Sequence, residues 1–170
     1  EEVAAIEAAI GAEVDLCGVH THGARLLPAT VEKLEAGILQ TSPAIERVAE
    51  YPASVLLKTT GGLGRYTSAH CMGLAIEKAS QFGIGSVAVR GVGHWGRAYS
   101  YALQAARRGY VGLAFTNAVA NFPAWGTAAP SLGNNPIAVG IPAADGQEPA
   151  VLDLAMTQAS IGRVRMAAEA

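Results

Sequence analysis

Apolar positions recur along the chain at two different spacings, which predict helices and buried strands in turn. Residues 1–13 carry apolar side chains at intervals of three and four, the spacing of one helix face. A second helix is expected to begin near Pro28, which suits a first helical turn, and to stop at Gly37. The pattern over residues 66–82 predicts a longer helix that Gly83 ends.

Short runs of consecutive apolar residues predict buried strands. These runs are residues 53–58, 84–90, 110–116, 137–142 and 149–155. The runs at 84–90 and 110–116 flank a helical pattern at 96–108 that Gly109 ends, so we expect a β-α-β arrangement with at least partly parallel strands. Residues 117–136 form a long segment rich in Asn, Gly and Pro, and loops of that length in compact domains are usually functional.

The order of these elements predicts an α/β fold. We divide the chain into a helical N-terminal segment with a substrate loop, residues 1–45, and an α/β core, residues 46–170. The chain begins without Met, and its last helical pattern, RVRMAAEA, has no terminating Gly or Pro. We therefore expect it to be part of a longer protein.

Composition narrows the class of protein. Hydrophobic residues make up 51% of the chain and charged residues 15%, which predicts a large interface or a missing half. No apolar run reaches the ~20 residues of a membrane span, and the formal net charge of −2 with scattered basic residues argues against a nucleic-acid surface. Two cysteines and no signal-peptide pattern indicate a cytoplasmic protein.

The turn GVGHWG at residues 91–96 matches the G-x-G-x-x-G pattern of dinucleotide-binding turns. A Rossmann fold also needs an acidic residue near the end of the second strand, and here that strand ends at Thr116 and Asn117. The turn nevertheless places His94 between a strand and a helix, where a neutral imidazole can take a proton from a hydroxyl group. The structural alternative is a histidine that only caps the helix.

Cys17, His20 and His22 lie within six residues of one another and suggest either a metal site or a substrate loop. A structural zinc site needs a further ligand pair, and residues 70–71 offer a His and a Cys that point in different directions on a helix. We therefore predict no metal. In a substrate loop, His22 would be a polar contact and Arg25 a partner for a carboxylate, the alternative for Arg25 being a solvated charge.

Other polar positions have structural as well as functional interpretations. The amides of SLGNNP, residues 131–136, can bind a ligand or form a plain turn. Asp153, at an expected strand end, either caps the next turn or orients a neighbouring group such as His94. Glu77 and Lys78 are expected on a solvated helix face.

Together these segments resemble the malate/L-lactate dehydrogenase-like family of NAD(P)-dependent oxidoreductases. The matching stretches, in the family's order, are THGARLLP (21–28), GLGRYTSAHCMGLAIEKASQFGIGSVAVRGVGHWG (62–96), GYVGLAFTNA (109–118), WGTAAPSLGNNPIAVGIPA (125–143) and VLDLAMT (151–157). The resemblance implies a family-specific, non-Rossmann NAD(P)-binding α/β fold with a mixed sheet and flanking helices, of which this chain is the N-terminal half.

The resemblance also implies residue roles. His94 would accept or donate the proton of the substrate hydroxyl and His22 would lie at the substrate; with Asp153 they are the catalytic candidates. The substrate-binding candidates are His22 and, from the substrate-loop interpretation and not from the resemblance, Arg25. The candidate cofactor-binding residues are Ala118, Gly133, Asn134, Asn135, Asp153, Leu154 and Ala155.

The predicted function is hydride transfer between NAD or NADP and a small 2-hydroxy or 2-oxo acid, such as malate, lactate or ureidoglycolate. The family implies a homodimer, and neither nucleic acid nor membrane is expected as a partner. The alternative is a truncated or non-catalytic relative that keeps the fold.

Three positions depart from the residues that are usual in this family. Leu26 stands where the family often has a carboxylate-binding Arg, Asn134 replaces a Thr, and Arg65 stands where a Gln is common.

Overall fold

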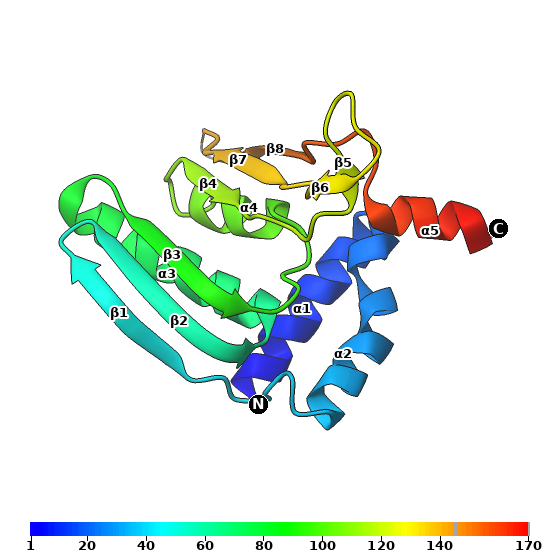
Figure 1. Ribbon diagram of the computed structural model, residues 1–170. Coiled ribbons are helices and arrows are strands. Elements are labelled where there is room, and N and C mark those ends of the chain that lie inside the picture. Colours follow the sequence, from blue (N-terminus) through cyan, green and yellow to red (C-terminus); the bar gives the residue numbers. More distant parts are fainter. Residues whose placement is uncertain (145, 170) are drawn as a thin grey trace.

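A mixed three-stranded sheet forms one part of the molecule (Figure 1). The computed structural model describes residues 1–144 and 146–169. Strand β2 (Ser54–Gly62) lies in the centre, antiparallel to β1 (Ile45–Tyr51) and parallel to β3 (Ser86–Val92). Helix α3 (Gly64–Phe82) connects the two parallel strands, and Gly83 ends it with a left-handed φ of 79°. This unit confirms the expected long helix and its glycine stop.

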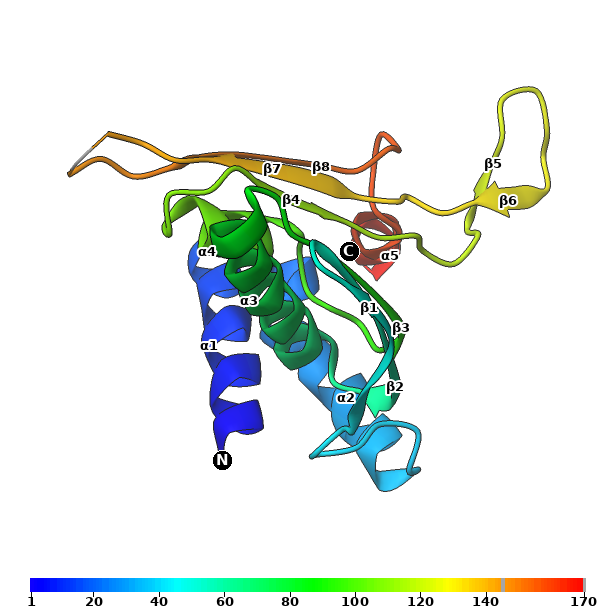
Figure 2. The same ribbon diagram turned by 90° about the vertical axis from the view of Figure 1, so that its left-hand side faces the viewer.

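A second sheet is entirely antiparallel. Strand β7 (Ile137–Ile141) pairs on one side with β4 (Gly112–Phe115) and on the other with β8 (Ala150–Leu154). Helix α4 (Tyr99–Ala106) packs against this sheet, and Figure 2 shows it beneath the strands. The predicted parallel β-α-β unit around residues 96–108 is therefore wrong, because the strands before and after α4 belong to different sheets.

Small residues explain why α4 lies against the second sheet. A Cβ atom on Gly140 would be 2.3 Å from the carbonyl oxygen of Ala102, and one on Gly112 would be 2.7 Å from the same oxygen. Ala114 and Ala138 lie in the buried cluster around this contact. The helix can approach the strands closely only because these positions have little or no side chain.

The outer face of the second sheet is strongly apolar. Leu113, Phe115 and Leu152 are 57%, 72% and 57% exposed there. These residues alternate with the buried Gly112 and Ala114 along β4, as expected for a strand with one covered face. Much of the apolar surface that the composition predicted is therefore located on this face.

Helices form the N-terminal part of the chain. Helix α1 (Glu2–Leu16) contacts α3, and two short 3-10 turns, η1 (His20–His22) and η2 (Ala24–Leu26), lead from it into α2 (Leu27–Glu35) (Figure 1). The remaining elements are β5 (Phe122–Pro123), β6 (Pro130–Leu132) and α5 (Ile161–Glu169). No helix among the described residues is long and apolar enough to cross a membrane.

Lys78 is buried, so its expected place on a solvated helix face is wrong. Its side chain is 9% exposed, and Nζ donates hydrogen bonds to Glu50 Oε1 at 2.8 Å and to the carbonyl oxygens of Tyr51 and Pro52. Lys78 thus holds the β1–β2 hairpin onto α3. The expected core position of Cys71 is confirmed, and burial raises the pKa of its thiol to about 11.

Candidate active site

His22 and His94 come together although they belong to distant parts of the sequence. Their ring centroids are 5.6 Å apart, and the ring planes are tilted by 47°. His22 ends the first 3-10 turn after α1, and His94 lies in the turn between β3 and α4. The structure therefore assembles one imidazole pair from the two motifs that the sequence singled out separately.

The His22 loop is held by Asp15, near the end of α1. Asp15 Oδ2 accepts a hydrogen bond of 2.7 Å from the backbone N–H of Ala24, and Oδ1 lies 3.2 Å from His20 Nδ1. The bond from Ala24 is the largest cause that lowers the pKa of Asp15. A Cβ atom on Gly23 would be 2.0 Å from Oδ1, so the loop needs glycine there to reach the carboxylate.

The His94 turn is held by backbone contacts to the start of α3. Gly93 donates its N–H to the carbonyl oxygen of Gly62 at 2.8 Å, and Gly64 packs against the backbone of His94. Gly96 donates its N–H to His94 Nδ1 at 3.1 Å. The glycines of GVGHWG thus shape a turn that orients the imidazole ring.

Both histidines are held in their neutral forms. Desolvation by the surrounding protein is the largest cause that lowers the pKa of His94 to about 4; electrostatic coupling to His22, Arg65 and Lys33 acts in the same direction. Desolvation also lowers the pKa of His22, while the Asp153 carboxylate acts in the opposite direction. His94 still has an exposed edge, so a neutral ring is accessible to a ligand at pH 7.

Asp153 lies at the N-terminus of α4. Its Oδ2 accepts a hydrogen bond of 3.1 Å from the backbone N–H of Tyr99 and lies 3.7 Å from Arg97 Nε. No hydrogen bond joins Asp153 to His94 within the described ranges, and its charge acts on His22. Asp153 therefore binds the start of the distant helix α4, which is not the next turn of the chain that the sequence suggested, and its electrostatic partner in the pair is His22.

Arg65 and Arg97 act on the imidazole pair, whereas Arg25 is a near neighbour of His22 in sequence. Arg65 is buried beneath both loops, and Arg97 stacks on the Tyr99 ring, with its guanidinium carbon 3.8 Å from the ring centroid. Arg25 lies exposed in η2. Neither Arg65 nor Arg97 was predicted to have a role, although each directly follows a glycine-rich motif, which is a signal that could have identified it.

The candidate cofactor residues converge at one end of the second sheet. Asn135 Oδ1 accepts a hydrogen bond of 2.8 Å from the N–H of Ala118, and a Cβ atom on Gly133 would lie 2.3 Å from the Ala118 carbonyl oxygen. Met156, next to Ala155, donates its N–H to the carbonyl oxygen of Asn134 at 2.7 Å. Residues 118 and 133–135 thus contact one another, and the adjacent Met156 connects residues 153–155 to them.

This cluster has features that suit a nucleotide. The Asn134 side chain makes no hydrogen bond to the described residues, so its amide is available to a carboxamide or ribose. Asn135 adopts a φ of 33°, a left-handed conformation that is uncommon outside glycine. The absence of a side chain at Gly133 lets the Ala118 carbonyl oxygen lie close against it. The residues present are compatible with the cofactor that the sequence suggested.

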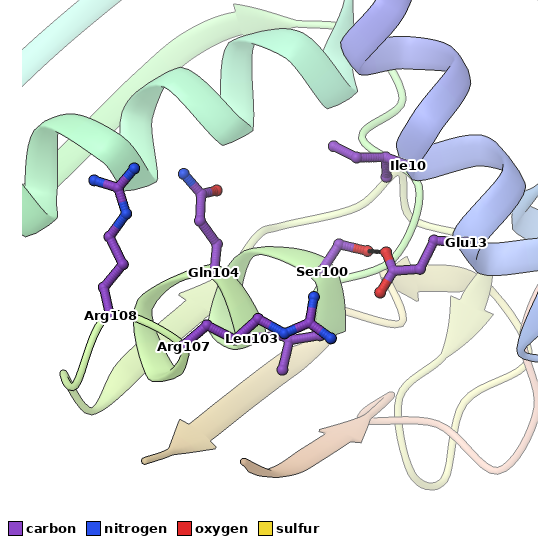
Figure 3. Close-up of a pocket in the computed structure, with 7 residues that line it drawn as sticks. All are labelled: Ile10, Glu13, Ser100, Leu103, Gln104, Arg107 and Arg108. Atoms are coloured by element: carbon purple, nitrogen blue, oxygen red, sulfur yellow. Dashed lines mark hydrogen bonds between the residues drawn. The ribbon is translucent and has the colours of Figure 1, made fainter. Parts of the chain in front are cut away.

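Neither of two other features adds to the site. The described residues contain no group of three or more His, Cys, Asp or Glu side chains that could hold a metal ion. A cavity of about 340 Å³ lies between α1 and α4 (Figure 3), where the Ser100 hydroxyl donates a hydrogen bond of 2.7 Å to Glu13. None of the candidate site residues lines this cavity.

Known proteins resemble this chain in sequence and in fold. The sequence model of a family described as malate/L-lactate dehydrogenase matches residues 1–170. The 2,3-diketo-L-gulonate reductase of Salmonella heidelberg (strain SL476) is 35% identical over 149 residues, which are 88% of this chain and 44% of that protein. The chain thus spans less than half the length of the curated relatives it matches.

Solved structures with similar names superpose on this chain over nearly its whole length. The malate dehydrogenase of Pyrococcus horikoshii OT3 superposes with a TM-score of 0.92 at 35% identity, over 96% of this chain and 47% of that one. The sulfolactate dehydrogenase of Methanocaldococcus jannaschii superposes with a TM-score of 0.91 at 31% identity, over 99% of this chain and 48% of that one.

Proposed function

Because this chain belongs to the malate/L-lactate dehydrogenase family, we propose that it carries the proton-transfer site of an NAD(P)-dependent oxidoreductase that interconverts a small 2-hydroxy acid and its 2-oxo acid. The observation that carries this proposal is the His22–His94 pair, with ring centroids 5.6 Å apart and both pKa values lowered. Neutral imidazoles at an accessible site suit the transfer of a hydroxyl proton.

His94 is the proposed proton acceptor and donor. When its neutral ring accepts the Gly96 N–H at Nδ1, the ring proton is on Nε2, from which His94 donates a hydrogen bond to a substrate oxygen. To accept a proton at Nε2, the ring must carry its own proton on Nδ1 and release Gly96. Proton transfer through Nε2 is therefore coupled to this one backbone hydrogen bond.

The proposed cofactor site is the cluster of Ala118, Gly133, Asn134, Asn135 and residues 153–155. NAD or NADP, when bound, supplies or accepts the hydride. The chain's own groups would bind and orient it: the free Asn134 amide offers two donors and an acceptor, and Gly133 lets the Ala118 segment pack closely beside that amide.

The substrate carboxylate has two proposed partners. Arg25 follows the His22 loop, as the sequence interpretation required. Arg97 is the second candidate: its charge acts on His22, its buried Nε has no hydrogen-bond partner among the described residues, and Tyr99 holds its guanidinium. An arginine held in this way loses little conformational freedom when it pairs with a carboxylate.

The proposed assembly is a homodimer. The alternative to the proposed function is that the chain keeps the family fold without catalytic activity.

Assays with cofactors and substrates test the proposed function. The relatives named above are a reductase and dehydrogenases of different substrates, so the assay must include several 2-oxo acids. Fluorescence titration with NADH and NADPH tests cofactor binding, and a panel of 2-oxo acids followed by loss of NAD(P)H absorbance tests turnover.

His94→Asn is the decisive variant. It should reduce turnover by about 10²–10⁴-fold, the usual contribution of a general acid–base group. His70→Asn, an exposed histidine on α3, is the matched control and should leave the rate unchanged. Full turnover by His94→Asn would refute the role of His94, whereas absence of cofactor binding and turnover in the unmodified chain would favour the non-catalytic alternative.

A further inference from the structure

Arg65 lies directly beneath the loop that carries His22. It occupies the first turn of α3, and its side chain is 5% exposed. Nη2 donates hydrogen bonds to the carbonyl oxygens of His22 at 2.9 Å and of Gly23 at 3.2 Å. Its guanidinium group is therefore bonded to the backbone of the candidate active-site histidine itself.

The same side chain supports the turn that carries His94. A Cβ atom on Gly96 would be 3.3 Å from Arg65 Nε and 3.7 Å from Cγ, so the Gly96 backbone packs directly on the arginine. Gly96 in turn donates its N–H to His94 Nδ1. One side chain thus contacts a residue on each side of the imidazole pair.

Glu7 on α1 completes the arrangement. Its Oε2 lies 3.4 Å from Arg65 Nη1, and its Oε1 accepts the backbone N–H of Tyr66 at 2.8 Å. Arg65 Nε has no partner among the described residues. Burial of a guanidinium group with an incomplete set of hydrogen bonds is unfavourable for the free energy of folding. An apolar side chain of similar volume often gives equal or greater stability at such a position.

We propose that Arg65 is a positioning residue of the candidate active site, which ties the His22 loop to the His94 turn and so determines how the two rings face each other. Its importance for turnover rests on the proposed function, but the geometric role does not. Arginine suits this role because its planar fork can reach two carbonyl groups at once, which a lysine ammonium group on a flexible stem does less rigidly.

The charge of Arg65 acts on both rings. His22 faces Asp153, Arg97 and Arg65, and His94 faces His22, Arg65 and Lys33. In both cases the positive charge of Arg65 favours the neutral ring. Removal of that charge should therefore raise the pKa of both histidines, whereas Arg65→Lys keeps the charge and changes mainly the hydrogen bonds.

Long-range ¹H–¹⁵N spectra of the four histidine rings test the proposal in the full chain. In Arg65→Gln the titration midpoints of His22 and His94 should both rise by about 0.5 pH or more. In Arg65→Lys the two midpoints should stay closer to the original, while the cross-relaxation between the two rings weakens at least twofold. Arg47→Gln, which removes an exposed charge on β1, is the matched control and should change none of these signals.

A folded Arg65→Gln protein with unchanged midpoints and unchanged ring cross-relaxation would overturn the proposal. If that variant does not fold, the test uses Arg65→Lys and Glu7→Gln. In Glu7→Gln the side chain retains the acceptor for the Tyr66 N–H and removes only the ion pair with Arg65. Unaltered cross-relaxation between the two rings in both variants would also overturn the proposal. These spectra need no turnover. If the proposed function is wrong, His94→Asn should keep full activity. If the positioning role of Arg65 is wrong, the Arg65 variants should leave the titration midpoints and the cross-relaxation of the two rings unchanged.

Discussion

Gly64 lies directly against the backbone carbonyl group of His94. A Cβ atom on Gly64 would be 2.1 Å from that oxygen and 2.6 Å from the carbonyl oxygen of Gly93. The start of α3 and the His94 turn can be this close only because position 64 has no side chain. The contact connects a glycine-rich helix start to the position of the proposed proton acceptor.

Gly64→Ala should therefore displace the His94 turn and destabilise the protein. The neighbouring atoms are backbone and cannot rotate away, so we expect a loss of about 1–3 kcal/mol, the usual cost of overpacking. Chemical denaturation measures the loss. Gly73→Ala in the same helix is the control, because the nearest atom would be Gln104 Nε2 at 3.8 Å, and there alanine should be neutral or stabilising by up to ~1 kcal/mol. Equal stability of the two variants would contradict the close approach.

The Gly96 hydrogen bond predicts the tautomer of His94. At pH 7 the ring should be neutral, with Nδ1 unprotonated and Nε2 protonated. The ¹⁵N chemical shifts of the two ring nitrogens distinguish this form from the other tautomer. Observation of a protonated Nδ1 in the absence of ligand would show that the Gly96 bond is not made in solution.

The lowered pKa of His94 predicts a pH dependence of stability. Its value is about 4 in the folded chain against an ordinary 6.5, so between these pH values the unfolded chain binds a proton that the folded chain does not. The contribution to the free energy of unfolding is complete above about pH 6.5 and is lost as the pH falls toward 4. Urea denaturation at pH 7 and pH 5 should show a smaller loss for His94→Asn than for the unmodified chain; equal losses would argue against the shift.

Asp153→Asn separates the capping role of this residue from its charge. Asn retains an acceptor for the Tyr99 N–H, so the loss of stability should be only about 0.3–1 kcal/mol, the usual effect of a charge near a helix N-terminus. Removal of the carboxylate should lower the pKa of His22, whose ionised form it favours. Histidine NMR titration checks this shift, with Glu148→Gln, an exposed acidic residue, as control. A midpoint of His22 that rises or stays constant would contradict the arrangement.

Local patterns predicted most helices and strands because capping, glycine stops and apolar spacing act within a few residues. The helix ended by Gly83, the strands at 137–142 and 149–155 and the core position of Cys71 are confirmed in this way. Strand β1 was not predicted, because most of its side chains are exposed and charged residues interrupt its apolar positions.

Pairing between distant elements could not be derived in the same way. An apolar run shows that a strand is buried but not which sheet it joins, so the strands on either side of α4 were assigned to one parallel unit although they belong to two sheets. Lys78 was expected in solvent because its local sequence is polar. Its partners are Glu50 and two carbonyl groups of another hairpin, which only the packing of that hairpin on α3 brings near.

The sequence by itself determined the family, because the resemblance follows from residue types and their order alone, and the family match confirms it. It also singled out the motifs around His22 and His94, whose chemical roles stay predictions. Only the tertiary structure decided that the two rings form one pair, that Asp153 faces His22, and that a buried Arg65 connects both loops. The reason is physical: ring contacts, desolvation and buried charges depend on distances between segments far apart in the chain, and these distances exist only once the helices and sheets have packed.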